Sequence, residues 1–231
     1  MPIILGLIGL IFLTIGILCT WIFPLLTLGI ICLIYGIFFL LSTGSYIYAT
    51  CLGKCQVWTE ILAQLKLQGD EQVLDMGCGR GAILLMAASF LSTGKATGID
   101  LWLSRDQSGN ALEVTRHNAE LEGVGEHIEL LTADMRKVPF PDNSFDVMLS
   151  SLAIHTISDP DGRKKAIDEA VRVLKPRGRL AIADIRHTTA YTQRLQELSM
   201  LEVQHRMLDW RFWYGGPWYA TKLISAHKPA E

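Results

Sequence analysis

Charged side chains are absent from the first 53 residues of this 231-residue chain, in which Lys54 is the first Asp, Glu, Lys or Arg. Two apolar runs, residues 2–22 and 25–41, fill most of that stretch. At about 1.5 Å per residue in a helix, each run comes near the length that crosses a hydrocarbon core of about 30 Å. The missing charge therefore predicts a membrane segment, so that the chemistry of the protein takes place at a membrane surface.

The features of a cleaved signal peptide are also lacking, because no basic residue precedes the apolar stretch and the stretch is about twice too long. A single helix over its whole length would overshoot a bilayer. Pro24, beside Trp21 and Phe23, is the expected break, since proline lacks the N–H and aromatic side chains favour the interface. We therefore predict a two-pass transmembrane helical hairpin over residues 1–42 and a juxtamembrane linker over residues 43–55.

Small residues recur at a spacing of seven on each predicted helix, Gly9 and Gly16 on the first and Gly29 and Gly36 on the second. Such a stripe lets two helices approach closely. The basic residues that normally set topology are nearly missing, since Lys54 alone lies near the membrane. A hairpin places both chain ends on one side, and a cytosolic cofactor would make that side the cytoplasm.

The five cysteines do not form the pattern of a secreted disulfide framework, because Cys19 and Cys32 lie within the apolar runs and Cys78 within a glycine loop. Cys51 and Cys55 remain, four apart and near the membrane, where they are open to acylation or to a soft metal or metalloid. Two lone thiols in such a place usually do neither, and no residue set predicts a metal site.

A basic stripe is likewise missing. The residues from Lys54 onward carry all 21 basic and 23 acidic side chains, a near-neutral balance that argues against nucleic acid as a partner. The length suits one α/β domain over residues 56–231. Helix-like and strand-like segments alternate there, which implies a parallel sheet with helices on both faces. The expected helices are residues 56–67, 82–91, 108–122 and 162–174, and the expected strands are residues 71–76, 96–101, 127–132, 145–150 and 179–185.

The first strand runs into a glycine-rich turn, with Asp75 followed by Gly77, Cys78, Gly79 and then Gly81. Glycines let the backbone approach a ligand, and the following helix offers N–H donors. A dinucleotide site expects G-x-G-x-x-G, whereas this loop reads G-x-G-x-G. An acid two residues ahead would repel pyrophosphate but suits a ligand with sulfonium and ammonium charges.

Further markers follow in order along the chain. Asp100 ends the second strand, where a carboxylate can accept hydrogen bonds from both ribose hydroxyls. Asp134 and Met135 follow the third strand, suited to an adenine amino group and its ring. The segments 139–147, 150–157 and 169–180 complete the series. Six such pieces in this order are not a chance arrangement.

These segments resemble the class I S-adenosylmethionine-dependent methyltransferases, and within them the small-molecule branch that includes quinone and sterol C-methyltransferases. The resemblance covers about residues 56–227. It implies an α/β, Rossmann-like sheet of seven strands with helices on both faces, preceded here by the two-helix transmembrane hairpin. The last strand, expected over residues 220–227, is antiparallel, and the cofactor is S-adenosyl-L-methionine.

The resemblance also implies a set of cofactor contacts. Asp75, Gly77 and Gly79 hold the methionine part, and Asp100 takes the ribose. The complete set that it implies is Asp75, Gly77, Cys78, Gly79, Asp100, Leu101, Asp134, Met135 and Ser151.

The adenine and the methyl group have their own contacts in this resemblance. Leu101 and Met135 sandwich the adenine, Asp134 bonds its amino group, and Ser151 lies beside the methyl group. The Asn/Asp-Pro-Pro-aromatic signature of amino-group methyltransferases is missing, because Ser150-Ser151-Leu152 stands in its place. Methylation of exocyclic base amines is therefore disfavoured.

His155 is the candidate catalytic residue, since it follows the fourth strand and histidine is the residue type that can exchange a proton near neutral pH. A base helps if the acceptor is a hydroxyl or an acidic carbon. The competing interpretation, which we favour, is a histidine that braces the loop or the cofactor.

A late aromatic cluster, Trp210, Trp213, Tyr214 and Trp218, surrounds a Gly-Gly-Pro turn. Most such clusters are core or a hairpin turn. Beside a membrane they also suit contact with lipid or the lining of an apolar acceptor pocket.

The sequence thus favours a membrane-anchored methyltransferase with the lipid bilayer as partner and a small lipophilic acceptor, such as an isoprenoid, quinone, sterol-like molecule or phospholipid. A water-soluble or metalloid acceptor is one alternative. A nicotinamide-dependent oxidoreductase is another, but no tyrosine has a lysine four residues later. A non-catalytic membrane module is the third, and the intact acids and glycines argue against it.

Overall fold

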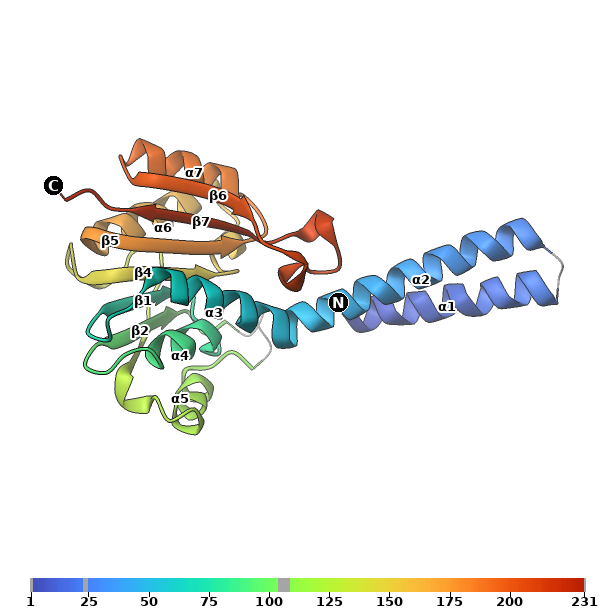
Figure 1. Ribbon diagram of the computed structural model, residues 1–231, viewed down its shortest axis with the longest axis horizontal. Coiled ribbons are helices and arrows are strands. Elements are labelled where there is room, and N and C mark those ends of the chain that lie inside the picture. Colours follow the sequence, from blue (N-terminus) through green and yellow to red (C-terminus); the bar gives the residue numbers. More distant parts are fainter. Residues whose placement is uncertain (1, 23–24, 104–108, 231) are drawn as a thin grey trace. The chain divides into compact units, whose positions relative to one another are not determined.

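The computed structural model describes residues 2–22, 25–103 and 109–230 (Figure 1). The contacts divide the chain into two compact units. The hairpin unit joins Met1–Val57 to Leu208–Thr221, and the sheet unit joins Trp58–Met207 to Lys222–Glu231.

Two long helices, α1 (Pro2–Trp21) and α2 (Leu26–Tyr48), pack side by side in the hairpin unit (Figure 1). The glycine stripes form their contact, because a methyl group built on Gly16 would lie 2.9 Å from the backbone nitrogen of Leu33. One built on Gly36 would lie 2.9 Å from the nitrogen of Leu13. The predicted close approach is confirmed, whereas Phe23 and Pro24, the expected break, lie outside the described residues.

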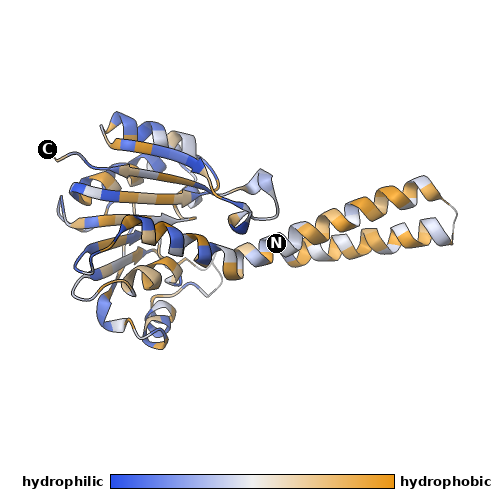
Figure 2. Cartoon of the chain, in the orientation of Figure 1, coloured by the Kyte–Doolittle hydropathy of each residue, from blue (hydrophilic) through white to orange (hydrophobic). Residues whose placement is uncertain are grey.

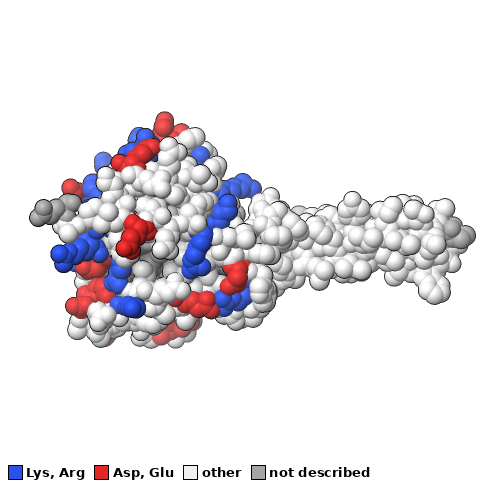
Figure 3. Space-filling view, turned by 45° about the horizontal axis from the view of Figure 1, so that its top comes forward, with Lys and Arg blue, Asp and Glu red and all other residues white. Residues whose placement is uncertain are grey.

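Most residues of this helix pair are apolar, as the colouring of Figure 2 shows, and many of their large side chains are exposed. Both helical segments are long and apolar enough to cross a membrane, and only 17% of the α1 window is buried. No Lys, Arg, Asp or Glu marks the hairpin in Figure 3, in contrast to the mixed charges of the sheet unit.

Beyond α2 the chain stays helical, through a π-helical turn (Ala49–Gly53) into α3 (Lys54–Leu65). This helical stretch includes residues 43–55, for which the sequence predicts a juxtamembrane linker. No proline interrupts that segment, and the wide turn places Gly53 so close to the carbonyl oxygen of Arg211 that a methyl group would lie 1.7 Å from it. Local backbone contact within the hairpin unit thus accompanies the helix irregularity.

Seven strands make one sheet in the order β3-β2-β1-β4-β5-β7-β6. The pairs among the first five strands are parallel, and β7 is antiparallel to both β5 and β6, as the sequence predicts. The strands are β1 (Gln72–Met76), β2 (Lys95–Asp100), β3 (Ile128–Thr132), β4 (Phe145–Ser151), β5 (Leu174–Asp184), β6 (Leu201–Met207) and β7 (Lys222–His227).

The helices of the sheet unit follow the expected alternation, with shifted ends. They are α4 (Ala82–Ala88), α5 (Leu112–Leu121), α6 (Pro160–Val173) and α7 (Thr188–Glu197). The predicted start of α5 at residue 108 lies outside the described residues. α6 begins two residues before Gly162 because Asp159 caps it, accepting from the Gly162 nitrogen at 2.7 Å, and Pro160 occupies its first turn.

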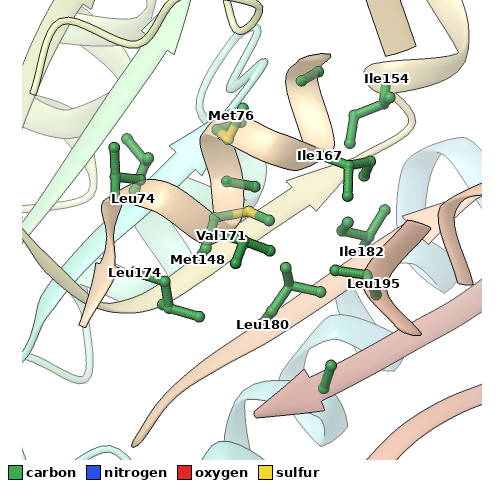
Figure 4. Packing of buried hydrophobic residues seen from close by; sticks show 14 of the residues in the cluster. Leu74, Met76, Met148, Ile154, Ile167, Val171, Leu174, Leu180, Ile182 and Leu195 are labelled. Carbon is green, nitrogen blue, oxygen red and sulfur yellow. The ribbon is translucent and has the colours of Figure 1, made fainter. Parts of the chain in front are cut away.

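Sequence reasoning did not locate α7 or β6. Most of β6 is exposed, so it carries no alternating apolar pattern. The core nevertheless includes Leu195 of α7, which packs with α6 and the strands (Figure 4). α6 and α7 thus pack on one face of the sheet. α4 contacts β1, β2 and β3.

Candidate cofactor site

The predicted site residues gather where the parallel strands end. Gly77 and Gly79 follow β1, Asp100 ends β2, and Ser151 ends β4, which pairs directly with β1. The chain runs from β1 to β2 on one side and reaches β4 on the other, so β1 and β4 flank the point where strand order reverses. In open α/β sheets, ligands bind in the crevice at this position.

The glycine loop has a backbone that only glycine adopts easily. Gly77 has φ of 79° and Gly79 has φ of 53°, both in the left-handed region. A methyl group on Gly77 would lie 2.3 Å from the Cβ of Ala153, so this turn passes close to the segment after β4. The Gly77 nitrogen donates to the Ile99 carbonyl at 2.8 Å, which ties the loop to β2.

Asp75 and Cys78 are both buried, at 2% and 7% exposure. Burial raises the pKa of the Cys78 thiol well above its usual value, and the carboxylates of Asp75 and Asp100 raise it further. The thiol faces the sheet, since a methyl group on Gly98 would lie 2.8 Å from its sulfur. Cys78 is thus suited to meet a ligand through its backbone and not as a nucleophile.

Asp100 accepts three hydrogen bonds within the site. Its carboxylate accepts from the Gly79 nitrogen at 2.9 Å, the Trp102 nitrogen at 2.7 Å and the Asn110 amide at 3.1 Å. It therefore joins the glycine loop to the end of β2. Leu101, predicted to cover one adenine face, is 45% exposed beside it.

Asp134 follows β3 as expected, but its carboxylate already has a partner. Arg136 donates from Nε and Nη2 to both carboxylate oxygens at 2.6–3.0 Å, and its backbone nitrogen adds another bond. The side-chain bonds from Arg136 chiefly hold the pKa of Asp134 below its usual range. Met135 reaches the glycine loop, because a methyl group on Gly77 would lie 3.1 Å from its Cε.

Ser151 is held in place by a residue that sequence reasoning did not select. The indole nitrogen of Trp58, a fully buried side chain on α3, donates to the Ser151 hydroxyl at 3.0 Å. Ser150, the preceding residue, donates to the Met76 carbonyl at 2.8 Å. The end of β4 is therefore fixed to both α3 and β1.

His155 lies in a short 3₁₀ turn (Ile154–Thr156) beside a buried acid, Asp184 at the end of β5. The His155 backbone nitrogen donates to Asp184 Oδ2 at 3.1 Å, and the Ile185 nitrogen donates to Oδ1 at 2.7 Å. The imidazole Nδ1 lies 2.5 Å from Oδ1 without hydrogen-bond geometry. Burial, and then Asp184, raise the pKa of the neighbouring Tyr191 hydroxyl.

Sequence reasoning missed Asp184. The signal that identifies it is an acid directly after the apolar run Leu180–Ala183, at the same edge of the sheet as Asp100.

Other motif residues support the fold. Arg172, in the segment 169–180, binds Glu169 and Asp142 and donates to the carbonyls of Val138 and Phe140. The loop before β4 is thereby fastened to α6.

The residues present fit S-adenosylmethionine. Gly77 and Gly79 both have the left-handed backbone that glycine favours, and a methyl group on Gly77 would clash with Ala153. Glycines in such a turn allow close approach of a ligand to the backbone. Asp75 and Asp100 supply carboxylates, which suit ammonium, sulfonium and ribose hydroxyls better than pyrophosphate.

Residues 67–219 match the model of a family described as a methyltransferase domain, and this match covers more than half of the chain. The chain belongs to this methyltransferase family. Its domain is of the kind that takes the methyl group from S-adenosylmethionine, and the family match removes the nicotinamide-dependent alternative.

Individual proteins agree with the family. The chain is 30% identical over 131 residues to the sterol 4-C-methyltransferase strm-1 of Caenorhabditis elegans, covering 57% of this chain and 36% of that protein. It is 31% identical over 134 residues to the ubiquinone/menaquinone biosynthesis C-methyltransferase UbiE of Ruegeria sp., covering 58% of this chain and 50% of that protein. The matches therefore span about half or less of these curated relatives.

A solved structure shares the fold at lower identity. The [4+2]-cyclase SpnF aligns with a TM-score of 0.61 and 20% identity, covering 75% of this chain and 80% of that one. A cyclase on this fold is a reminder that function depends on the site and not on the architecture.

Proposed function

We propose that this protein is a membrane-anchored methyltransferase that moves the methyl group of S-adenosyl-L-methionine to a small, lipophilic acceptor. One observation carries the proposal: a methyltransferase domain is joined to a charge-free helical hairpin whose large apolar side chains point outward. The hairpin crosses the bilayer twice, and the domain lies in the cytoplasm, where the cofactor is made.

The surface of the hairpin supports a lipid environment. A core helix of a soluble protein buries its large apolar side chains, whereas Ile3, Leu10 and Leu41 are 77%, 54% and 70% exposed. Exposed apolar surface of this extent marks a membrane or protein contact. The tight glycine packing between α1 and α2 favours a hairpin over two separate segments.

The cofactor supplies a methyl group on a sulfonium, which is already a good leaving group. The chain has mainly to hold donor and acceptor in line, and fixed positioning can supply much of the rate. Asp100 would hold the ribose, the loop at Gly77 and Gly79 the methionine part, and Leu101 and Met135 the adenine. Ser151, fixed by Trp58, would lie beside the reacting methyl group.

His155 is assigned a bracing role in this proposal. Its backbone is bonded to Asp184, and Ala153 in the same segment touches the turn at Gly77. The connection from Asp184 to His155 and Ala153 would thus hold the glycine loop in the form that binds cofactor. A base at His155 would matter only for an acceptor that must lose a proton during transfer.

The acceptor class follows from the anchor. A molecule that partitions into the bilayer is concentrated next to an anchored domain, whereas a water-soluble acceptor gains nothing from the hairpin. The names of the two curated relatives refer to a sterol and to quinone biosynthesis, which agrees with such an acceptor. A water-soluble or metalloid acceptor is the competing proposal, to which the exposed Cys51 and the partly buried Cys55 would be relevant.

The test uses the full-length protein, reconstituted with a lipid extract of its native membranes and supplied with methyl-labelled S-adenosylmethionine. We expect label in the lipid fraction. Asp100→Ala should reduce the labelling at limiting cofactor, and Glu120→Gln, an equal charge change on the exposed face of α5, should not. Label confined to water-soluble products would refute the acceptor class, and transfer to neither fraction would refute the activity.

A further inference from the structure

The segment between β6 and β7, here called the aromatic loop (Leu208–Thr221), belongs to the hairpin unit. It is closed at its base, where the Leu208 nitrogen donates to the Thr221 carbonyl at 2.9 Å. The Trp213 indole also donates back to the Leu208 carbonyl at 2.9 Å. Two short 3₁₀ turns, Trp210–Phe212 and Pro217–Tyr219, shape it. The loop is therefore an ordered element and not a loose connection.

The aromatic loop runs along one end of α2. Trp210 stacks on Tyr48 with ring centroids 5.1 Å apart, and Tyr214 meets Tyr46 edge-on at 5.2 Å. The Ser45 hydroxyl donates to the Trp213 carbonyl at 3.1 Å.

The contact continues towards the turn of the hairpin, where Trp218 packs on Phe38 at 5.3 Å. From Tyr48 to Phe38 the loop follows ten residues of helix, which is about 15 Å at 1.5 Å per residue.

The aromatic loop extends along α2 into the stretch where α1 packs beside it. Gly6, near the start of α1, faces Thr43 of α2, with a built methyl group 3.5 Å from the threonine methyl. Phe38 is five residues further towards the turn, or about 7.5 Å deeper along the helix. Trp218 thus contacts α2 closer to the hairpin turn than the start of α1, in the part of α2 that packs against α1.

Polarity changes along the loop in the same direction. Asp209 and Arg211 form an ion pair at 2.6 Å where the loop meets Tyr48. No charged residue occurs from Phe212 to Thr221. Trp218 at the deep end remains 57% exposed although it contacts Phe38. Tryptophan with one exposed apolar face and an N–H is the side chain enriched at the boundary between headgroups and acyl chains.

We propose that the aromatic loop is a second membrane contact of this protein, one that enters the bilayer interface without crossing it and places Trp218 among the lipids at the depth of Phe38. The proposal rests on the membrane anchoring proposed above and adds a lipid-binding role for residues 212–221. Charge at the shallow end and its absence at the deep end match the boundary between water and acyl chains, so the occupant is the bilayer itself. Contacts with α2 already hold the loop in place at this depth. The loop therefore loses less conformational entropy when it inserts into the interface.

For the test, the full-length protein is labelled with 5-fluorotryptophan and reconstituted in phosphatidylcholine nanodiscs. Each ¹⁹F resonance is assigned with a variant in which one tryptophan is replaced by phenylalanine. Relaxation is then measured with a nitroxide on the lipid chain near the headgroup and, separately, with a water-soluble gadolinium chelate. The chain provides its own references: Trp21, 83% exposed at the end of α1, and Trp58, fully buried in the sheet unit. Trp102, after β2, reports on the water-facing part of the sheet unit.

We expect the lipid nitroxide to broaden the resonances of Trp218 and Trp21 and to leave those of Trp58 and Trp102 sharp. Broadening of Trp21 with a Trp218 resonance that responds only to gadolinium would overturn this proposal and leave the anchoring intact. A Trp21 resonance that ignores the lipid nitroxide would overturn the membrane anchoring together with the loop. Phe38→Ala gives a further check, since removing the ring that holds Trp218 should weaken the lipid effect on Trp218 and not on Trp21.

Discussion

Asp100 has two tasks that a single substitution separates. Its carboxylate accepts three hydrogen bonds from the protein, including one from Gly79 in the glycine loop, and it is the acid assigned to the ribose. A carboxylate has enough lone pairs to accept from the ribose as well. The same side chain can therefore shape the loop and bind the cofactor.

For Asp100→Ala we expect weaker binding of S-adenosylmethionine, by about 1.5–3 kcal/mol or roughly 10- to 150-fold in Kd, because charge-assisted bonds to the cofactor are lost. Asp100→Asn keeps the shape but points an amide N–H at one of the donors, so it should also bind weakly. Titration calorimetry measures both, with Glu120→Gln as the matched control. Unchanged affinity in Asp100→Ala would remove this carboxylate from the site.

His155 has two candidate roles: a general base in methyl transfer, or a residue that, together with Asp184, holds the glycine loop in place. If the bracing role holds, His155→Ala, which keeps the backbone bond but removes the imidazole beside Asp184, should lower cofactor affinity and turnover together while the acidic limb of the pH profile persists. A general base at His155 predicts instead a turnover loss of about 10²–10⁴-fold with cofactor affinity kept and that limb gone. Kinetics and calorimetry on one variant distinguish the two.

Asp184→Ala provides the partner measurement. It leaves the partly buried backbone nitrogens of His155 and Ile185 without their acceptor, at a cost of up to about 1–3 kcal/mol each, the range for a fully buried group. We expect a lower thermal midpoint and weaker cofactor binding than in His155→Ala, since the backbone bond is lost as well. A variant as stable as the wild type would contradict the brace.

At the scale of elements, the helix pair depends on glycines that the sequence already placed on one stripe. A methyl group on Gly36 would lie 2.7 Å from the Leu13 side chain and 2.9 Å from its nitrogen, so the helices must separate to admit it. Gly44, on the same helix, has nothing within 4 Å of that position. The two residues form a natural pair of test and control.

Gly36→Ala should destabilise the hairpin by about 1–3 kcal/mol, the usual cost of overpacking. Gly44→Ala should be neutral or stabilising by up to about 1 kcal/mol, because alanine favours a helix. Unfolding by titration with sodium dodecyl sulfate in mixed micelles compares them. Equal midpoints for the two variants would contradict the tight α1–α2 contact.

The turn between α3 and β1 is held by Glu71, which is buried. Burial raises its pKa, but bonds from the Gln68 and Gly69 nitrogens and the nearby Arg179 outweigh it, so the pKa lies below its usual 4.5. A lowered folded pKa adds stability above the unfolded value, and that stability is lost as the pH falls through the folded value.

We therefore expect Glu71→Gln to unfold at a lower temperature than the wild type near neutral pH. The gap should narrow as the pH falls below 4.5 and close once the wild-type carboxylate is protonated in the folded state as well. Thermal scans across this range provide the measurement. A gap that stays constant with pH would show that the charge of Glu71 is not responsible.

The sequence predicted the elements whose signals are local. Apolar runs marked the central strands, and the order of the motifs placed Gly77, Asp100 and Asp134 at strand ends. It did not locate β6, because an exposed edge strand has no apolar period. It also missed Trp58 and Asp184, since their partners Ser151 and His155 are 93 and 29 residues away along the chain. Contacts between distant segments leave no periodic trace.

The sequence shows the aromatic cluster but does not indicate which part of the chain it contacts. Trp210 and Trp218 lie more than 160 residues from the helix positions that they contact, Tyr48 and Phe38. Only the fold brings the loop to the hairpin unit.

For the whole molecule, anchoring and chemistry make one claim: the acceptor is reached from within the bilayer. An enzyme of this kind responds to the acceptor concentration in the membrane plane, not to that in the total volume. Adding inert phospholipid lowers the acceptor concentration in the membrane plane and leaves its concentration in the total volume unchanged. The dependence on each can therefore be distinguished without knowing the detailed mechanism.

The most direct test therefore fixes the amounts of full-length protein, cofactor and the lipid fraction that accepts the methyl group, and raises the proportion of inert phosphatidylcholine in the vesicles. The initial rate of methyl transfer is measured at each composition, with cofactor binding as the control for intact protein. The account predicts a rate that falls as the acceptor is diluted within the membrane while cofactor affinity stays constant. A rate that does not depend on the added phospholipid would contradict it.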